Sequence, residues 1–419
     1  MSLSLRSMIP LALVAAAALG ACDKKNEGGA PAGASSAPVA KALPTPASLT
    51  MFKPLMAASL TKDSGDVVSL GRQLYYDPRL SRNHDISCNS CHDLARYGID
   101  GEKTSPGHKK ARGDRNSPTT YNAYLHFRQF WDGRSADVEE QATGPMMNPV
   151  EMAMVDEPHL VALLSSIPEY VDAFKKAYPK EDSPISLKNA GRAIGAFERG
   201  LTTPSRFDKF LGGDKSALTD AERQGLADFM DTGCTTCHVG QLLGGDRYQK
   251  LGLVKPWPNQ VDQGRFKVTN KDEDRMFFKV PSLRNIDKTA PYFHDGSAAT
   301  LDEAVRLMAS HQLGRELPPE KVTSIVTFLK SLTGEIPAAY IKQPDMPKST
   351  PKTPKPDPAL RSGPASGAHV GVLCCGPHHD AHRCLPADRP GPARLLRGLD
   401  PGGRGHGARP RRGRHAADR

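Results

Sequence analysis

The sequence has few cysteines and few aromatic residues, and it lacks an apolar segment long enough to cross a membrane. Its 419 residues include 8 Cys and 2 Trp, and aromatic residues make up 6% of the chain. The apolar run at residues 8–19 is about a dozen residues long, whereas a membrane-spanning helix needs about 20. Convincing alternation of apolar and polar residues, which would indicate strands, is also missing. These absences favour a mainly α-helical globular core with long connecting loops.

The net charge of +10 suggests a nucleic-acid or anionic-membrane partner, but its distribution argues against one. Residues 361–419 contain eleven Arg, four Asp and no Lys or Glu, so this segment alone supplies +7. It also lacks Gln, Asn, Ile, Thr, Met, Phe, Tyr and Trp, and with so few large apolar residues burial does not offset the entropy lost on ordering. We therefore expect a disordered tail, which is either a natural basic extension or an out-of-frame translation of GC-rich DNA. We expect no nucleic-acid partner.

The N-terminal segment has the features of an export signal. Arg6 precedes the apolar run, which ends in the sequence Leu-Gly-Ala-Cys22 and resembles a bacterial lipobox. We expect residues 1–21 to be a lipoprotein signal peptide and Cys22 to be the lipidated first residue of the mature protein. A plain signal peptide with an incidental Cys is the alternative. If Cys22 is lipidated, the protein lies in the periplasm and its lipid tethers it to a membrane.

Helical signals dominate from about residue 51 to about residue 340. Thr219 and Glu222 have the spacing of a capping box before an amphipathic run, and Thr300 and Glu303 repeat that spacing. A helical run precedes a Cys-x-x-Cys-His motif twice, which predicts two related domains. The expected organisation is a flexible tether at 22–50, an N-terminal domain at 51–215, a C-terminal domain at 216–340 and a disordered Pro- and Arg-rich tail at 341–419.

Two five-residue motifs carry the clearest chemistry: Cys88-Asn89-Ser90-Cys91-His92 and Cys234-Thr235-Thr236-Cys237-His238. Two thiols three residues apart can both reach the vinyl groups of one porphyrin as thioethers, and the adjacent His then falls under the iron. A thioredoxin-like redox pair or half of a zinc site are the competing interpretations. A redox pair does not need the His and usually sits in a βαβ unit, which is missing here. We therefore expect two covalent c-type haems, with His92 and His238 as proximal iron ligands.

Spacing alone does not identify the sixth ligand of either iron. A Met ligand raises the reduction potential, whereas an open or weakly held position permits peroxide or oxygen chemistry. Any single His or Met is more often part of the core or surface than a ligand. The candidates are His84, His108, His126 and His159 near the first haem, and Met146, Met147, Met276 and Met308 near or beyond the second.

Further strings follow one another between about residues 70 and 334. They include Asp77-Pro78-Arg79-Leu80-Ser81, Arg115-Asn116-Ser117-Pro118-Thr119, Gln129-Phe130-Trp131-Asp132-Gly133-Arg134, Glu140-Gln141-Ala142, Pro149-Val150-Glu151-Met152, Pro281-Ser282-Leu283-Arg284-Asn285-Ile286 and Thr289-Ala290-Pro291-Tyr292-Phe293-His294. In their order and spacing, and together with the haem motifs, these strings resemble the bacterial di-haem cytochrome c peroxidases. The resemblance implies two cytochrome c-like haem domains.

The resemblance also implies a catalytic site at the first haem. The haem at His92 would have the lower potential and would be the place where peroxide is cleaved. His108 would be its removable distal ligand, Glu151 the distal acid and base, and Gln141 a polar neighbour that orients peroxide.

At the second haem the resemblance implies electron transfer. The haem at His238 would have the higher potential, and Met308 would be its distal ligand. Trp131 would lie between the two haems and assist electron transfer. Calcium would lie at the domain interface, bound by Asn116 and by the backbone carbonyls of Thr289 and Pro291.

The function implied is the reduction of hydrogen peroxide to water with electrons from a small cytochrome c or cupredoxin, in a homodimer. Two alternatives remain. One is the related group that matures methylamine dehydrogenase by oxidising a protein substrate, in which a Tyr stands at the position of Met308. The other is a non-enzymatic di-haem electron carrier. Met308 argues against the first alternative, and the presence of Gln141 and Glu151 argues against the second.

Overall fold

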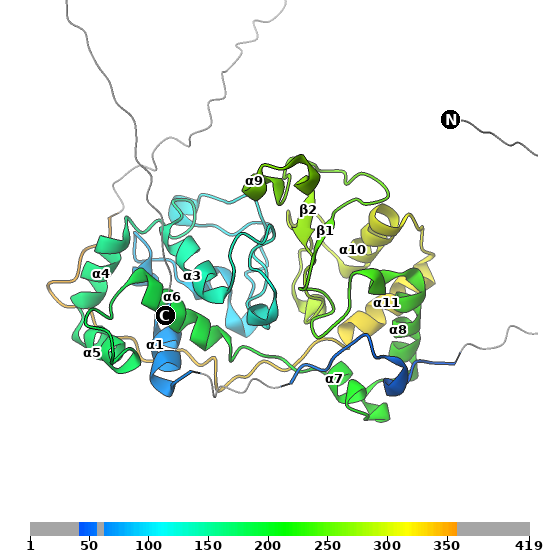
Figure 1. Cartoon of the computed structure of the whole chain (residues 1–419), viewed down its shortest axis with the longest axis horizontal. Coiled ribbons are helices and arrows are strands. Elements are labelled where there is room, and N and C mark those ends of the chain that lie inside the picture. Colours follow the sequence, from blue (N-terminus) through cyan, green and yellow to red (C-terminus); the bar gives the residue numbers. More distant parts are fainter. Residues whose placement is uncertain (1–41, 57–62, 358–419) are drawn as a thin grey trace, which may run out of the picture. The chain divides into compact units, whose positions relative to one another are not determined.

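The computed structural model describes residues 42–56 and 63–357, which are mainly α-helical as expected (Figure 1). The expected signal peptide, the lipidation site Cys22 and the Arg-rich segment 361–419 lie outside the described residues. Within the described ranges, no helix is both long enough and apolar enough to span a bilayer.

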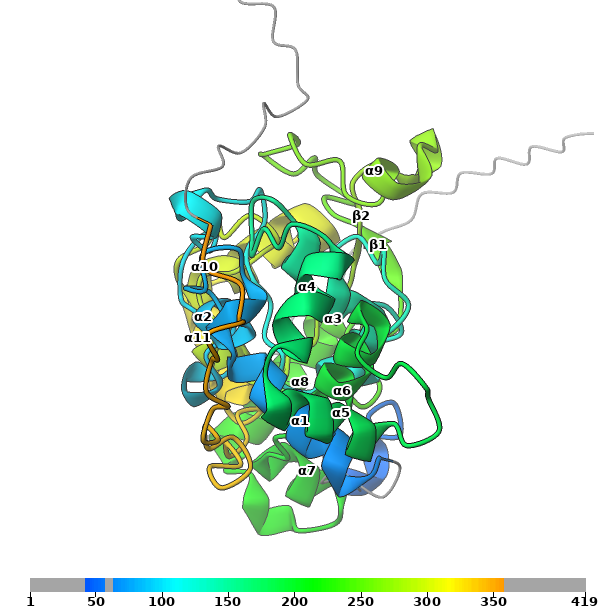
Figure 2. The ribbon, with the colours of Figure 1, turned by 90° about the vertical axis from the view of Figure 1, so that its left-hand side faces the viewer.

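The first half of the described chain packs around one apolar core. Leu74 and Tyr75 of α1 meet Phe174 of α5 and Phe197 of α6 there, and all four side chains are essentially inaccessible to solvent. Figure 2 looks onto this half, with α1, α4, α5 and α6 on the near side. Its helices are α1 (Gly65–Tyr76), α2 (Cys88–Cys91), α3 (Val138–Met147), α4 (Glu157–Ser165), α5 (Pro168–Ala177) and α6 (Leu187–Glu198).

The second half has a separate core and a short β-ribbon. The Thr219 side chain accepts a hydrogen bond from the Glu222 backbone at the start of α8, and Thr300 does the same for Glu303 at the start of α10, so both predicted caps are confirmed. The elements are α7 (Arg206–Leu211), α8 (Asp220–Thr232), α9 (Phe266–Thr269), α10 (Leu301–Leu307) and α11 (Pro319–Lys330), with strands β1 (Tyr248–Lys250) and β2 (Phe277–Lys279). The strands are antiparallel and pair Tyr248 with Lys279.

The internal repeat predicted from the sequence appears as two equivalent helix crossings. A Cβ atom at Gly71 of α1 would lie 1.8 Å from the carbonyl oxygen of Ala193 in α6. A Cβ atom at Gly225 of α8 would lie 2.1 Å from the carbonyl oxygen of Ser324 in α11. In each half, the helix that precedes the haem motif therefore crosses a later helix at a glycine, because only glycine permits so close an approach.

A shared threonine joins the two halves at their inner ends. Thr203 is fully buried, and its hydroxyl accepts hydrogen bonds from the side-chain amides of Asn122 at 2.9 Å and Asn285 at 2.8 Å. Both asparagines have a positive φ, near 60°, and each precedes a short 3₁₀ turn. The two asparagines thus occupy equivalent positions in the two halves, and Thr203 connects them.

The terminal segments of the described chain correct three of the expected boundaries. Leu49 and Phe52 pack into the second core with Phe207, so residues 42–50 are not part of a tether, and neither 51–56 nor α7 belongs to the first domain. At the other end, Ile341 and Met346 pack on the first core, so the expected disordered tail is wrong for residues 341–357. The reason is the same at both ends, because a few apolar side chains in a Pro-rich segment find a core on the opposite half.

Polar contacts hold the C-terminal segment along the first half. Tyr340 stacks on Phe197 with ring centroids 5.2 Å apart, and its hydroxyl donates to the Phe197 carbonyl at 2.7 Å. Farther along, Asp357 forms an ion pair with Arg82 at 3.3 Å. Figure 1 shows this segment, yellow to orange, running from the end of α11 back to α4 and α5.

Candidate functional site

The first haem motif forms one short helical turn at the edge of a cavity. The α2 turn begins after Ser87, whose backbone N–H donates to the Ser90 hydroxyl at 3.0 Å, and it ends at His92, whose N–H donates to the Cys88 carbonyl at 2.9 Å. Cys88, Cys91 and His92 all line the cavity. The local sequence thus brings two thiols and one imidazole to the same wall, as thioether attachment and axial ligation require.

The second motif follows α8 and lines a second cavity. Gly233, with a φ of 97°, ends the helix, and Cys234, Cys237 and His238 follow directly. Met308, in the π-helical turn Met308–Gln312 after α10, lies in the same cavity wall. The structure therefore brings together the proximal and distal ligands that were expected for the second haem.

Both histidines have the tautomer that an iron ligand needs. Nδ1 of His238 lies 2.8 Å from the Leu243 carbonyl and Nδ1 of His92 lies 3.4 Å from the Gly98 carbonyl, so each Nδ1 carries the proton and Nε2 has a lone pair for a metal. Burial lowers the pKa of both rings, although these carbonyls act in the opposite direction. Neutral imidazoles in fixed orientation fit axial ligation of iron.

The four motif cysteines fit covalent haem attachment better than redox or zinc chemistry. Among the described residues, no disulfide joins the cysteines of either motif, and burial raises the pKa of Cys88 and of Cys234 to about 12, so neither thiol is suited to act as a reactive thiolate at neutral pH. Over residues 42–56 and 63–357, no group of three or more His, Cys, Asp or Glu side chains could hold a metal ion. A zinc site built on either motif is therefore not supported.

The two cavities differ in size and polarity. The first has a volume of about 460 Å³ and is bordered by Gln141, Glu151, Arg115 and Arg134. The second has a volume of about 230 Å³ and a mainly apolar lining that includes Phe229, Leu283, Phe293, Val305 and Leu329. The first cavity therefore offers charged and amide side chains to a small polar molecule, whereas the mainly apolar second cavity suits a buried electron-transfer centre.

The two expected distal residues lie at the first cavity, as the sequence resemblance implied. Gln141 comes from α3, and Glu151 comes from the turn that follows this helix. The Glu151 carboxylate accepts a hydrogen bond from the Asn148 side-chain amide at 2.9 Å. Burial raises the pKa of Glu151, while Arg134 and Asn148 act in the opposite direction. A partly buried carboxyl with a raised pKa is suited to take up and release a proton.

His108 is placed differently from expectation, because its ring does not line either cavity. Its backbone N–H donates to the carbonyls of Val150 at 3.1 Å and Glu151 at 2.7 Å, which holds the loop behind the Glu151 turn. Its side chain is 3% exposed, and neither ring nitrogen has a hydrogen-bond partner among the described residues. The structure therefore has the first cavity without His108, and the role of His108 as a ligand stays a prediction for another conformation.

Of the other candidate sixth ligands, only His126 and Met308 line a cavity. His159 is exposed and lies 2.7 Å from its neighbour Asp156, as a surface histidine does. Met146 is fully buried in the first core, and Met276 packs with Trp257 in a small cluster that Met308 also contacts. His84 and Met147 likewise lie away from both cavities.

A single wall separates the two cavities. Trp131 lies in this wall, and its indole N–H donates to the Asn116 carbonyl at 2.9 Å. The position of Trp131 therefore agrees with its expected place between the haems. Seven residues line both cavities: Asn116, Ser117, Pro118, Thr119, His126, Trp131 and Lys279.

The expected calcium ligands lie in the wall of the second cavity. Asn116, Thr289 and Pro291 all line it, and the Asn116 backbone N–H donates to the His294 carbonyl at 2.7 Å. The Asn116 side-chain amide donates to the Glu102 carbonyl at 2.9 Å, which directs its oxygen away from that carbonyl. An amide oxygen and nearby backbone carbonyls are hard ligands of the kind calcium takes.

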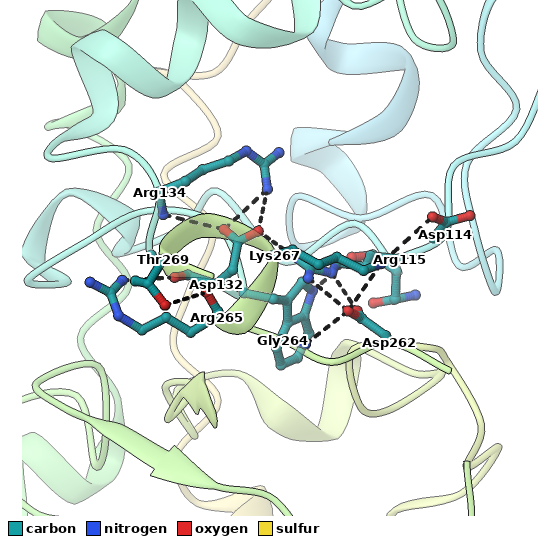
Figure 3. Close-up of polar contacts among 12 residues, drawn as sticks. Asp114, Arg115, Asp132, Arg134, Asp262, Gly264, Arg265, Lys267 and Thr269 are labelled. Atoms are coloured by element: carbon teal, nitrogen blue, oxygen red, sulfur yellow. Dashed lines mark hydrogen bonds and ion pairs between the residues drawn. The ribbon is translucent and has the colours of Figure 1, made fainter. Parts of the chain in front are cut away.

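Sequence reasoning missed a cluster of charged side chains (Figure 3), several of which line the first cavity. The Arg115 guanidinium donates to Asp262 at 2.6 and 2.9 Å and to Asp132 at 2.6 Å. Lys267 lies 3.2 Å from Asp262. Burial acts to raise the pKa of Asp262, but the Arg115 guanidinium holds it well below the usual range. Arg115 and Asp132 stand in strings that the resemblance singled out, whereas no local pattern marks Asp262, about 150 residues away.

Comparison with known proteins agrees with this geometry. A sequence model described as di-haem cytochrome c peroxidase matches residues 66–216. The chain is 47% identical over 317 residues to the cytochrome c551 peroxidase of Pseudomonas aeruginosa, covering 73% of this chain and 90% of that one. It is 45% identical over 304 residues to the cytochrome c551 peroxidase of Nitrosomonas europaea, covering 72% and 89%.

Among solved structures, the chain is similar to a MauG-like protein associated with microbial copper homeostasis. The TM-score is 0.60 at 30% identity, and the match covers 70% of this chain and 96% of that one. The relatives, the two haem motifs and the two cavities all indicate the same family. This chain belongs to the di-haem cytochrome c peroxidase family, whose members carry two c-type haems.

Proposed function

We propose that this protein reduces hydrogen peroxide to water at the cavity of His92. The observation that carries the proposal is that Gln141 and Glu151 lie in the wall of that cavity, while Met308 lies in the wall of the other. The similarity to cytochrome c551 peroxidases supports the same activity. Residues that handle peroxide and residues that handle electrons are thus separated into two cavities of one chain.

When bound, the haem iron supplies the redox chemistry, in which peroxide takes two electrons and two protons and becomes two water molecules. Glu151 moves the proton between the peroxide oxygens. Because Asn148 donates to Oε1 of Glu151, Oε2 is the oxygen that takes the proton from the first peroxide oxygen and returns it to the second. The Gln141 amide, in the wall of the same cavity, orients the peroxide by hydrogen bonding.

The test is Glu151→Gln, measured as steady-state peroxide reduction with a reduced donor. We expect turnover to fall by about 10²- to 10⁴-fold, the usual contribution of a positioned acid or base. Haem content and visible spectra should stay unchanged, since the amide has nearly the same shape. Glu169→Gln, on the exposed side of α5, is the matched control and should keep full turnover. Unchanged turnover in Glu151→Gln would refute the proton-transfer role.

Electrons would enter at the second haem, with His238 and Met308 as its axial ligands. We propose a small cytochrome c or cupredoxin as donor, and Trp131, in the wall between the cavities, as the side chain that assists transfer. His108 would reach the first iron in the oxidised resting protein and withdraw from the cavity when the second haem is reduced. Its position behind the Glu151 turn supports an open first cavity as one of two states.

A protein-oxidising function of the methylamine-utilisation type is the second candidate, favoured by the similarity to a MauG-like structure and to methylamine utilization proteins at 30 to 32% identity. Met308 in the second cavity and the higher identity to cytochrome c551 peroxidases argue for the peroxidase. A pure electron carrier would not need Gln141 and Glu151. Peroxide turnover by the half-reduced protein separates the three, because the carrier would show none and the protein-oxidising enzyme little.

We further propose calcium at Asn116 and at the carbonyls of Thr289 and Pro291. All three line the second cavity beside the contact between Asn116 and His294, so bound calcium would link the two halves. Calorimetric titration of chelator-treated protein should show binding that Asn116→Ala abolishes. Equal binding by both proteins would remove Asn116 from the site.

A periplasmic location with a lipid anchor at Cys22 remains our proposal, as does a homodimer. The segment before residue 42 has the composition of an export signal and tether. Membrane fractionation of Cys22→Ser tests the anchor, since a variant that still sediments with membranes has another attachment. Light scattering with and without calcium tests the dimer.

A further inference from the structure

A buried lysine and a histidine contact each other in the wall between the two cavities. Nζ of Lys279 lies 2.6 Å from Nδ1 of His126. Both residues line both cavities, and Lys279 is only 5% exposed. The two residues are 153 positions apart in the sequence. Neither residue has a part in the mechanism described above.

The backbone fixes the position of Lys279. Its N–H donates to the Trp131 carbonyl at 2.8 Å, and Lys279 pairs with Tyr248 across the β-ribbon. His126 is fixed from the other side, because its ring packs on Gly245, where a Cβ atom would lie 2.8 Å from the imidazole. The amine is therefore held in the wall by rigid elements of both halves of the molecule.

The charge of Lys279 has no carboxylate partner within ion-pair distance among the described residues. An ammonium has three donors, of which His126 takes one, and a buried cation without a counter-ion is costly. Burial accordingly lowers the pKa of Lys279 to about 7, and Asp132 acts in the opposite direction. Asp132 itself is bound to Arg115 and Arg134. Among the described residues, the Lys279 ammonium therefore lacks a counter-ion.

Each c-type haem carries two propionate carboxylates, and the family places one haem in each of the cavities that Lys279 lines. We propose that Lys279, held by His126, binds a haem propionate in the wall between the cavities and tunes the reduction potential of that haem. The proposal rests on the presence of two haems and not on peroxidase activity. An ammonium beside a haem stabilises the reduced form, because reduction adds one negative charge near it.

Proton uptake follows from the same geometry. When one electron arrives at the nearby haem, the amine binds a proton more tightly, so up to one proton enters from solvent for each electron. Besides the propionate, the titratable or charged groups around the pair are Asp132 with its two arginines, Tyr248 on the facing strand with Arg265 at its hydroxyl, and His294, whose ring centroid lies 4.3 Å from that of Phe278. The pKa of Lys279 itself is displaced towards neutrality.

The experiment is spectroelectrochemical titration of the fully haem-loaded protein across the neutral pH range. For the wild type we expect one haem whose midpoint potential falls as pH rises. Lys279→Met, which keeps volume and removes the charge, should lower that potential and flatten its pH profile. Lys279→Arg should keep the potential high and also flatten the profile, since a guanidinium does not titrate there. Lys175→Met, an exposed change on α5, should behave as wild type.

Three results would overturn the proposal. One is a wild-type profile that is flat for both haems, which needs no variant and so does not depend on folding. Another is a Lys279→Met protein with two haems per chain and unchanged potentials. The last is equal displacement by the Met and Arg variants, which indicates altered packing and not charge. Loss of peroxidase turnover alone with unchanged potentials counts against this inference and leaves the proposed function standing.

Discussion

Replacing Gly71 by Ala tests whether the crossing of α1 and α6 positions the first haem site. A Cβ atom at Gly71 would lie 1.8 Å from the Ala193 carbonyl oxygen, whereas ordinary contact begins at 3.4 Å, so the helices must separate by about 1.6 Å. The atoms that this Cβ would meet belong to the α6 backbone and cannot rotate away. The cost should therefore reach the upper end of the overpacking range, about 3 kcal/mol, against a gain of about 1 kcal/mol in helix propensity.

Gly65, at the start of the same helix, gives a matched control. A Cβ atom there would meet nothing within 4 Å, so Gly65→Ala should stabilise the protein by up to about 1 kcal/mol. Urea unfolding followed by circular dichroism should therefore separate the two variants by about 3 kcal/mol. Movement of α1 away from α6 should also affect the first haem site, because Tyr75 of α1 donates to the His92 carbonyl at 2.9 Å. Gly71→Ala should therefore alter the visible spectrum of the first haem. Equal stabilities and unchanged spectra would show that the crossing does not control the site.

Three further outcomes are expected. Burial raises the pKa of Glu198 to about 8, with Glu139 adding to the effect and Arg199 opposing it; because this folded-state pKa lies above the unfolded one, stability is full below the unfolded pKa and is lost as pH rises to about 8. In urea unfolding, Glu198→Gln should escape this loss, which corresponds to about 5 kcal/mol at most, and parallel pH profiles would contradict it. Peroxidase turnover should rise with pH through the raised pKa of Glu151, because the carboxylate must first accept a proton, and the Glu151→Gln profile should lack this limb. His108→Ala should be active without prior reduction in a stopped-flow assay, and a variant that still needs reduction would exclude the gating role.

Local patterns in the sequence predicted local structure well. The caps at Thr219 and Thr300 and the short turns that carry His92 and His238 depend only on neighbouring residues, so they could be found from spacing alone. The distal groups required more, because Glu151 and Met308 are ordinary residues in their own segments. Only the family resemblance connected them to the haem motifs, and the two cavities agree with that connection.

Contacts between distant segments could not be predicted. In the sequence His126 was only one of several candidate ligands and Lys279 had no predicted role, and neither segment indicates a contact with a residue 153 positions away. The prediction of disorder for residues 341–357 was wrong for a related reason. The proline content of this segment suggested disorder, but Ile341 and Met346 pack on the apolar core of the first half. Composition describes a segment in isolation and carries no information about the core on which it packs.

The crossed terminal segments make the two haem halves depend on each other for folding. Residues 42–56 complete the second core and residues 336–346 complete the first, so each half borrows a piece of chain from the far end of the other. Each arm packs on the core of one half and continues along the chain into the other half, which couples the two cores into one cooperative transition. A cut near Thr203 would accordingly yield fragments that fold by associating with one another. A stand-alone version of either half would need its missing arm attached at a new terminus.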